Sequence, residues 1–124
     1  MVMQKQLKAI HCEVAPTHVI KIYIAGDRNL ARQVLQKYVM KGLCVSISEE
    51  EYIYTMGNET GIVVNLINYP RFPKTSTEMI DEARKLAEHL IEELHQGSCT
   101  IVDYHGHIHV GDSYFISRRP EDLL

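Results

Sequence analysis

The chain has 124 residues, enough for one domain, and its 13 Lys and Arg against 16 Asp and Glu give a formal net charge of −3. Hydrophobic residues make up 45% and charged residues 23%, which excludes a disordered chain. The acidic balance argues against a reader of duplex nucleic acid. Since no apolar run could span a bilayer and residues 1–8 lack the apolar core of a secretory signal, we expect a soluble cytoplasmic protein without membrane contact.

The first predicted elements are a strand, a helix and a second strand. Residues 18–25 are β-branched and aromatic and stop at a Gly-Asp pair, which is typical of a strand that ends in a tight turn. Asp27 is the expected N-cap of a helix whose apolar stripe continues to Gly42. Residues 43–48 then return as a strand, so this part of the chain has the size of a βαβ unit.

A hairpin is expected next. The acidic run 49–51 is predicted to be a solvated turn, and the apolar runs 52–56 and 61–68 flank the glycine-containing segment 57–60, the pattern of strand, turn and strand. The segment 69–73 contains two prolines, which cannot donate to a ladder, and is therefore predicted to be a rigid extended loop.

The longest helix and the last strands follow. Thr75 and Glu78 have the spacing of a capping box, and the wide apolar face behind them runs to Gly97. Residues 99–103 and 108–110 are expected to form two more strands. The width of the apolar helix face suggests burial against a second copy as well as against the sheet, so we expect a homodimer or a higher homo-oligomer with pockets at subunit interfaces.

These elements predict one α+β domain over residues 1–124: a small mixed sheet packed by two helices, with a βαβ start, a hairpin, a long helix and C-terminal strands. Residues 1–17 are expected to form an arm or an edge strand, and residues 111–124 an extended polar tail. Three widely spaced cysteines indicate neither a disulfide framework nor a cysteine zinc site, and Cys44 and Cys99 are interpreted as small core residues.

The chain has no phosphate-binding loop, nucleophile elbow or zinc-protease motif, which removes most motif-based assignments of an enzyme. Among the features that remain, the loop after residue 67 is the first candidate site. In this loop Arg71 lies between the aromatic residues Tyr69 and Phe72, which suits a flat anionic ligand. Asn68 offers an amide for a base edge or a ribose hydroxyl. The alternative is that both rings close the core and the arginine is solvated.

Two further sites are considered for anions. Gly26 and Arg28 flank a helix N-terminus that can bind phosphate, although the carboxylate of Asp27 favours a simple capped helix. Arg118 and Arg119 are either solvated or reach a neighbouring subunit's pocket to clamp phosphate.

Alternate histidines form the fourth candidate site: His105, His107 and His109. Alternation in a strand places three imidazoles on one face, which is a sufficient zinc set, with Asp103 or Asp112 available to orient them. Gly106 indicates a turn that would break this alternation, and an exposed polar strand face is the alternative.

The blocks Gly42-Leu43-Cys44-Val45, Tyr52-Ile53-Tyr54-Thr55, Gly57-Asn58-Glu59-Thr60-Gly61 and Leu66-Ile67-Asn68-Tyr69-Pro70-Arg71-Phe72-Pro73, followed by one long helix, resemble those of a phage protein family. This family comprises the small Thoeris anti-defence sponges of the first described type. The resemblance extends over residues 20–102, and the block around Asn68 is its most distinctive part.

The resemblance implies a protein that is not an enzyme and needs no cofactor. Members bind glycocyclic ADP-ribose made by TIR-domain proteins and withhold it, which blocks Thoeris-type bacterial immunity. Some also hold cyclic di- or trinucleotides at a separate site in a higher oligomer such as a hexamer. The implied ligand residues are Asn68, Arg71 and Phe72, with Arg118 or Arg119 as clamps.

Two other functions remain open from the sequence. A metal-dependent nucleotide hydrolase would use the three histidines as ligands and Asp103 or Asp112 as base. A protein-binding inhibitor would use an edge strand or the acidic surface and would need no small ligand.

Overall fold

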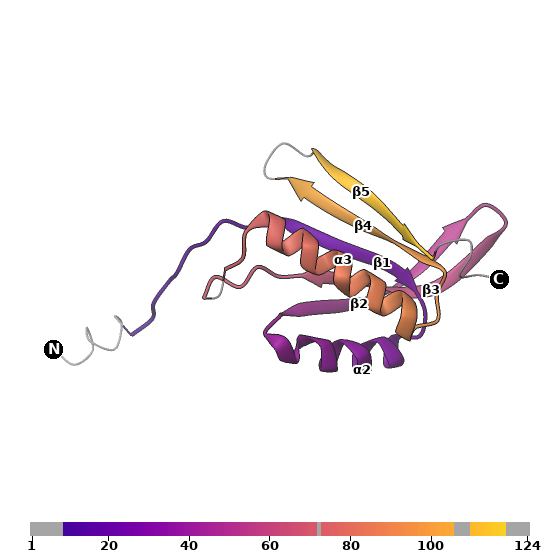
Figure 1. Ribbon diagram of the computed structural model, residues 1–124, viewed down its shortest axis with the longest axis horizontal. Helices are drawn as coiled ribbons and strands as arrows, with labels where there is room; N and C mark the ends of the chain where they lie inside the picture. Colours follow the sequence, from indigo (N-terminus) through magenta and orange to yellow (C-terminus); the bar gives the residue numbers. More distant parts are fainter. Residues whose placement is uncertain (1–8, 72, 106–109, 119–124) are drawn as a thin grey trace.

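The computed structural model describes residues 9–71, 73–105 and 110–118. Its five-stranded sheet has the order β2-β3-β1-β4-β5, with β1 (Val19–Ala25), β2 (Val45–Tyr54), β3 (Gly57–Leu66), β4 (Ser98–His105) and β5 (Val110–Ser117). The helical elements are α2 (Arg28–Tyr38), the 3-10 turn η1 (Val39–Lys41) and α3 (Ser76–Glu93). Both α-helices contribute to one apolar core and therefore cover the same face of the sheet (Figure 1).

The predicted α+β class, with helices packed on one sheet, is confirmed. The pairing inside the sheet differs from the expected mixed sheet, because every adjacent pair of strands is antiparallel. β1 and β2 run in the same direction, as a βαβ unit requires, but β3 returns from the hairpin and lies between them. The elements from β1 to β4 thus have the ferredoxin-like, split βαβ arrangement, and β5 extends its edge.

The hairpin turn lies earlier than predicted. β2 continues through the acidic run 49–51, and the chain turns at Thr55 and Met56, whose φ of 68° is left-handed. Charged side chains are well tolerated there, because β2 is an edge strand and its charges keep other strands from pairing with it. The segment 57–60, expected in the turn, belongs to β3. Gly61 lies in β3 as predicted, and a side chain would not fit there, because a Cβ would lie 2.4 Å from the Ile24 carbonyl oxygen.

The two chain ends also differ from the expectations. Residues 110–117 form β5 where a polar tail was expected, because Tyr114 and Ile116 lie on the same strand face and pack against the core. Residues 9–18 precede β1 as an arm outside any strand, which favours the first of the two alternatives. Cys99 is buried in β4, as predicted, whereas Cys44 is half-buried just before β2.

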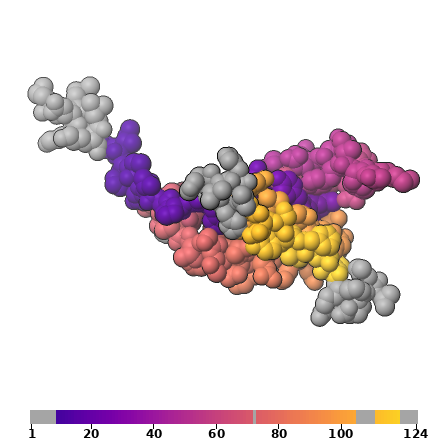
Figure 2. Space-filling model, turned by 90° about the horizontal axis from the view of Figure 1, so that it is seen from above, coloured from indigo at the N-terminus to yellow at the C-terminus, as the bar shows by residue number. Residues whose placement is uncertain are grey.

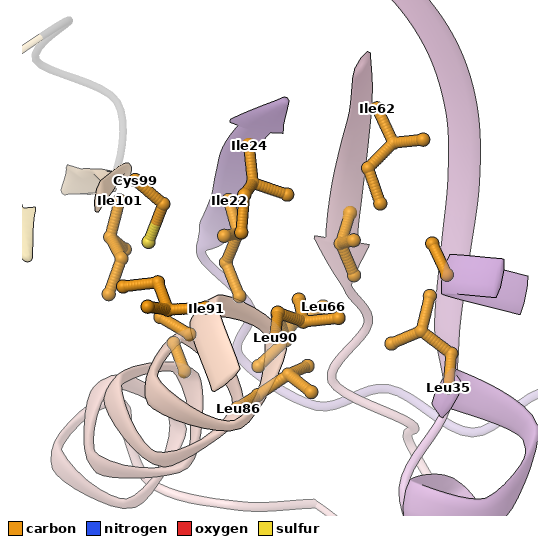
Figure 3. Close-up of a cluster of buried hydrophobic side chains, with 14 of the residues drawn as sticks. Ile22, Ile24, Leu35, Ile62, Leu66, Leu86, Leu90, Ile91, Cys99 and Ile101 are labelled. Carbon is orange, nitrogen blue, oxygen red and sulfur yellow. The ribbon is translucent and has the colours of Figure 1, made fainter. Parts of the chain in front are cut away.

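The predicted caps fix both helices. Asp27 accepts a hydrogen bond from the Leu30 amide at 2.8 Å, which begins α2. Thr75 and Glu78 exchange the reciprocal bonds of a capping box at the start of α3. The buried face of α3 then packs on aliphatic side chains of the three central strands (Figure 3). Each large side chain buried in this way contributes about 1.5–3 kcal/mol.

The sheet has two ends, which we call the loop end and the turn end. At the loop end, β1 begins, β3 ends, and the connection 67–75 leads into α3. At the turn end, β1 reaches Gly26, α2 begins and α3 ends. The arm leaves the body at the loop end (Figure 1), and the β2–β3 hairpin extends from the opposite side (Figure 2). Among the described residues, α3 included, no helix combines the length and the apolar character that crossing a bilayer requires.

Candidate functional site

A cavity of about 480 Å³ opens at the loop end and is called the loop cavity. Its lining comes from two connections, the one between η1 and β2 and the one between β3 and α3: Gly42, Leu43, Cys44, Ile67, Asn68, Tyr69 and Lys74. The volume lies in the range of small-molecule sites, and most of the lining is apolar with a few polar groups, the usual character of such a site.

The backbone holds the walls of the loop cavity together. Gly42 adopts a φ of 104°, a left-handed conformation that lets the chain leave η1 and turn into β2. The Ile67 amide donates to the Cys44 carbonyl at 3.1 Å and thereby joins the two walls. Tyr69 is 46% exposed, so a large part of its ring is accessible to a ligand.

Asn68 is a clasp in this structure. Its amide nitrogen donates to the carbonyls of Pro16, at 2.9 Å, and Lys74, at 3.1 Å. Its amide oxygen accepts from the Lys74 backbone at 2.8 Å. Because both N–H donors of this buried side chain are used, Asn68 has only acceptor capacity left for a ligand. It ties the arm and both ends of the loop to one point.

Tyr69 also borders a second cavity of about 480 Å³, the arm cavity. The other lining residues are His11 and Glu13 from the arm and Pro70 and Arg71 from the loop. The structure therefore brings Tyr69 and Arg71 together, as the sequence suggested. Phe72 lies outside the described residues.

The anion sites predicted at the turn end are occupied by contacts within the chain. Arg28 approaches Glu49, with 3.5 Å between its Nε and the carboxylate Oε1, and both side chains are exposed. Arg118 donates from Nε to the Gln96 carbonyl at 2.9 Å and from Nη2 to the Ile91 carbonyl at 3.3 Å, so it caps the C-terminus of α3. Arg119 lies outside the described residues.

Distance separates these residues from the loop. The 18 residues of α3 at about 1.5 Å each give a length of about 27 Å between the loop end and the turn end. Gly26 packs against Leu94 and Gln96 at the far end of this helix. Within one copy, therefore, Gly26, Arg28 and Arg118 do not share a site with Tyr69 and Arg71.

The histidine hypothesis falls largely outside the described residues, because His107 and His109 are not among them and only the backbone of His105 is placed, in β4. In the part of the chain that is described, no three His, Cys, Asp or Glu side chains gather as metal ligands. Asp103 is buried, and its Oδ1 lies 3.7 Å from Nε2 of His18, a pairing that sequence reasoning missed. The available signal was the position of His18, two residues before the buried Ile20 on the same strand face.

A polar network fixes the wall beside the loop cavity. Tyr38 donates to Glu82 at 2.6 Å, and the Lys41 ammonium lies 2.6 Å from the same carboxylate. Burial opposes ionisation of Glu82, but the hydrogen bonds from Lys41 and Tyr38 outweigh it and lower the pKa of the carboxyl. The network joins η1 to α3 directly before Gly42.

The sequence matches no protein-family model and no curated protein. Two solved structures share the fold. A phage SAM lyase in its apo state has a TM-score of 0.65 and 13% identity, over 89% of this chain and 98% of that one. A phage SAM lyase in complex with S-methyl-5'-thioadenosine has a TM-score of 0.59 and 10% identity, over 88% and 95% of the two chains.

These likenesses bear on two expectations from the sequence: the absence of enzymatic activity and the resemblance to the Thoeris sponges. The expectation that this chain is not an enzyme is overturned, because the solved proteins that share its fold are lyases. Both solved proteins come from phages, and one of them holds S-methyl-5'-thioadenosine. Neither is a Thoeris anti-defence sponge, so the finer resemblance stays a prediction.

Proposed function

We propose that this chain is a lyase that binds S-adenosylmethionine in the loop cavity and releases S-methyl-5'-thioadenosine, called methylthioadenosine below. The observation that carries this proposal is the fold, which matches almost the full length of a phage SAM lyase. A cavity of about 480 Å³ at the loop end supports it, since this volume suits a nucleoside.

The residues of the loop cavity suit a nucleoside with a sulfur substituent. The exposed ring of Tyr69 offers a stacking platform for adenine, worth about 1–3 kcal/mol. Leu43 and Ile67 offer apolar contact to the ribose and the sulfur. Lys74 places one cation at the rim.

The proposed reaction removes the positive charge from sulfur. The bond between the sulfonium and the aminobutyryl chain breaks, its electron pair stays on sulfur, and methylthioadenosine leaves as a neutral thioether. The four-carbon fragment either forms a new C–O bond to its own carboxylate oxygen, which closes a lactone, or gives the proton of the neighbouring carbon to solvent water and forms a C=C bond. Because the charge disappears during this step, apolar walls such as Leu43 and Ile67 disfavour the charged substrate more than the transition state.

The same proposal includes self-association. The helices cover one face of the sheet, and the other face exposes Val19, Tyr104 and Phe115, the last at 72%. We expect copies of the chain to bury this face against one another. Light scattering coupled to size exclusion would then give a multiple of 14.2 kDa, and Phe115→Glu would give the monomer mass.

The activity is tested by incubating the purified chain with S-adenosylmethionine and following methylthioadenosine by chromatography. Tyr69→Ala is expected to lower the turnover at subsaturating substrate about tenfold or more, through the lost stacking. Tyr54→Ala is the matched control, because Tyr54 is 51% exposed but lies on the hairpin. Equal loss in both variants would contradict the assignment of the loop cavity.

The same assay contains cyclic ADP-ribose isomers as competing ligands. After removal of free ligand and heat denaturation, recovery of an intact cyclic nucleotide without any cleavage of S-adenosylmethionine would refute the lyase. Formation of methylthioadenosine by the parent chain supports it.

A further inference from the structure

Two cavities of different character at the loop end share one lining residue, Tyr69. Tyr69 lines the loop cavity, whose other walls are mostly apolar, and it lines the arm cavity, whose other walls are mostly polar. A ligand that lies against this ring therefore meets an apolar space on one side and charged groups on the other. S-adenosylmethionine has the same division, with a nucleoside at one end and an α-amino acid at the other.

The arm cavity contains the charges that an α-amino acid needs. Arg71 supplies a guanidinium with five N–H donors, enough to bind a carboxylate in addition to any contact within the chain. Glu13 supplies a carboxylate for an ammonium group, and it is only half exposed, at 47%. His11 lies beside it, with 3.7 Å between Nε2 of His11 and Oε1 of Glu13.

A hydrogen-bonding side chain outside the arm cavity holds the arm next to the loop. Asn68 donates to the Pro16 carbonyl at 2.9 Å, three residues after Glu13. The same side chain accepts from the Lys74 amide, three residues after Arg71. One buried amide therefore fixes both segments that line the arm cavity, which limits the entropy cost of binding between them.

We infer that the arm cavity is the subsite for the α-amino-acid end of the substrate, with Arg71 binding the carboxylate and Glu13 binding the ammonium. The inference rests on the proposed function and adds to it a recognition of the substrate group that is absent from methylthioadenosine.

The test uses three thioethers that the lyase reaction cannot consume, because their sulfur carries no charge. S-adenosylhomocysteine has both charged groups, its decarboxylated analogue has only the amine, and methylthioadenosine has neither. Dissociation constants are measured by titration calorimetry for the parent chain, Arg71→Gln and Glu13→Gln. Arg84→Gln and Glu88→Gln, which change exposed residues of α3, are the matched controls.

Arg71→Gln is expected to weaken S-adenosylhomocysteine about tenfold and to leave the decarboxylated analogue and methylthioadenosine unchanged. Glu13→Gln is expected to weaken both amine-containing ligands by a similar factor and to leave methylthioadenosine unchanged. The inference would be overturned if each variant lost the same affinity for all three ligands, or if neither variant lost any. Binding of methylthioadenosine to the parent chain would still support the proposed site in that case. If methylthioadenosine fails to bind the parent chain, the proposed function itself is refuted.

Discussion

The two ends of the sheet use similar residues for different purposes. At the turn end, Asp27 caps α2, Arg118 caps α3, and Arg28 lies beside Glu49. At the loop end, Tyr69 and Arg71 line cavities. The difference shows that an arginine or a helix terminus does not by itself indicate a ligand, because caps and ion pairs within the chain use the same groups.

Asn68 lies at the loop end, and its side chain forms hydrogen bonds to the backbone of Pro16 and Lys74. These hydrogen bonds keep the loop and the arm in place for the neighbouring residues. Single substitutions at one end at a time separate effects on the stability of the chain from effects on its affinity for methylthioadenosine.

The largest effect is expected from Asn68→Ala. The variant loses three partly buried hydrogen bonds to the backbone of Pro16 and Lys74, which costs about 2–3 kcal/mol of the free energy of unfolding. Urea denaturation measures it. Asn65→Ala is the control, because the Asn65 side chain makes an exposed hydrogen bond to Ser46 and its loss should cost less than about 0.5 kcal/mol. Equal stability of the two variants would show that the clasp does not hold the loop.

Arg118→Ala should lower stability by about 1–2 kcal/mol, because the carbonyls of Ile91 and Gln96 lose their charged donor. The affinity for methylthioadenosine should stay at the parent value, since this arginine lies at the far end of α3. A weaker affinity with unchanged stability would instead place Arg118 in a site formed with a second copy, as the sequence suggested.

Glu82→Gln tests the network beside the loop cavity through its pH dependence. The pKa of Glu82 lies below its ordinary value of 4.5 in the folded chain, so its contribution to stability is present above about pH 4.5 and is lost as the pH falls through the folded pKa. The free energy of unfolding of the parent should therefore exceed that of the variant by about 1 kcal/mol at pH 7, and the difference should shrink as the pH falls below 4.5. A gap that is constant between pH 7 and pH 3 would contradict this assignment.

Arg28→Gln should have the smallest effect. Its ion pair with Glu49 is exposed on both sides, so the expected change in the free energy of unfolding is within about 0.5 kcal/mol. Binding of methylthioadenosine should also be unchanged. Weaker binding would restore the turn end as a ligand site.

Local signals predicted the helices well, and the strand pairing much less well. Asp27, Gly42 and the pair Thr75 and Glu78 act within a few residues of their own positions, so the sequence displays their roles directly. The insertion of β3 between β1 and β2 depends on partners far along the chain, which no local pattern records. The prediction of a turn at 49–51 is wrong, because these residues continue β2. Their charge is tolerated at the edge of the sheet, a position that depends on the strand order and not on the local sequence.

The candidate site was predicted in part for the same reason. Tyr69 and Arg71 stood out because prolines and aromatic residues surround them in one short segment. Leu43 and Glu13 did not, because only the folded chain brings the arm and the connection after η1 to this loop. The ligand role of Asn68 stays a prediction, and its backbone partners leave its side chain few ways to bind a ligand.

The three cysteines give the natural chain a set of chemical reporters. Burial raises the pKa of the Cys99 thiol to about 12, so this group should resist alkylation at neutral pH. Cys12 is exposed between His11 and Glu13, and Cys44 belongs to the lining of the loop cavity. A fluorophore attached at Cys12 would therefore report on the arm, while protection of Cys44 from a maleimide would report on the loop cavity. Occupancy of the two cavities can thus be followed separately without introducing a new residue.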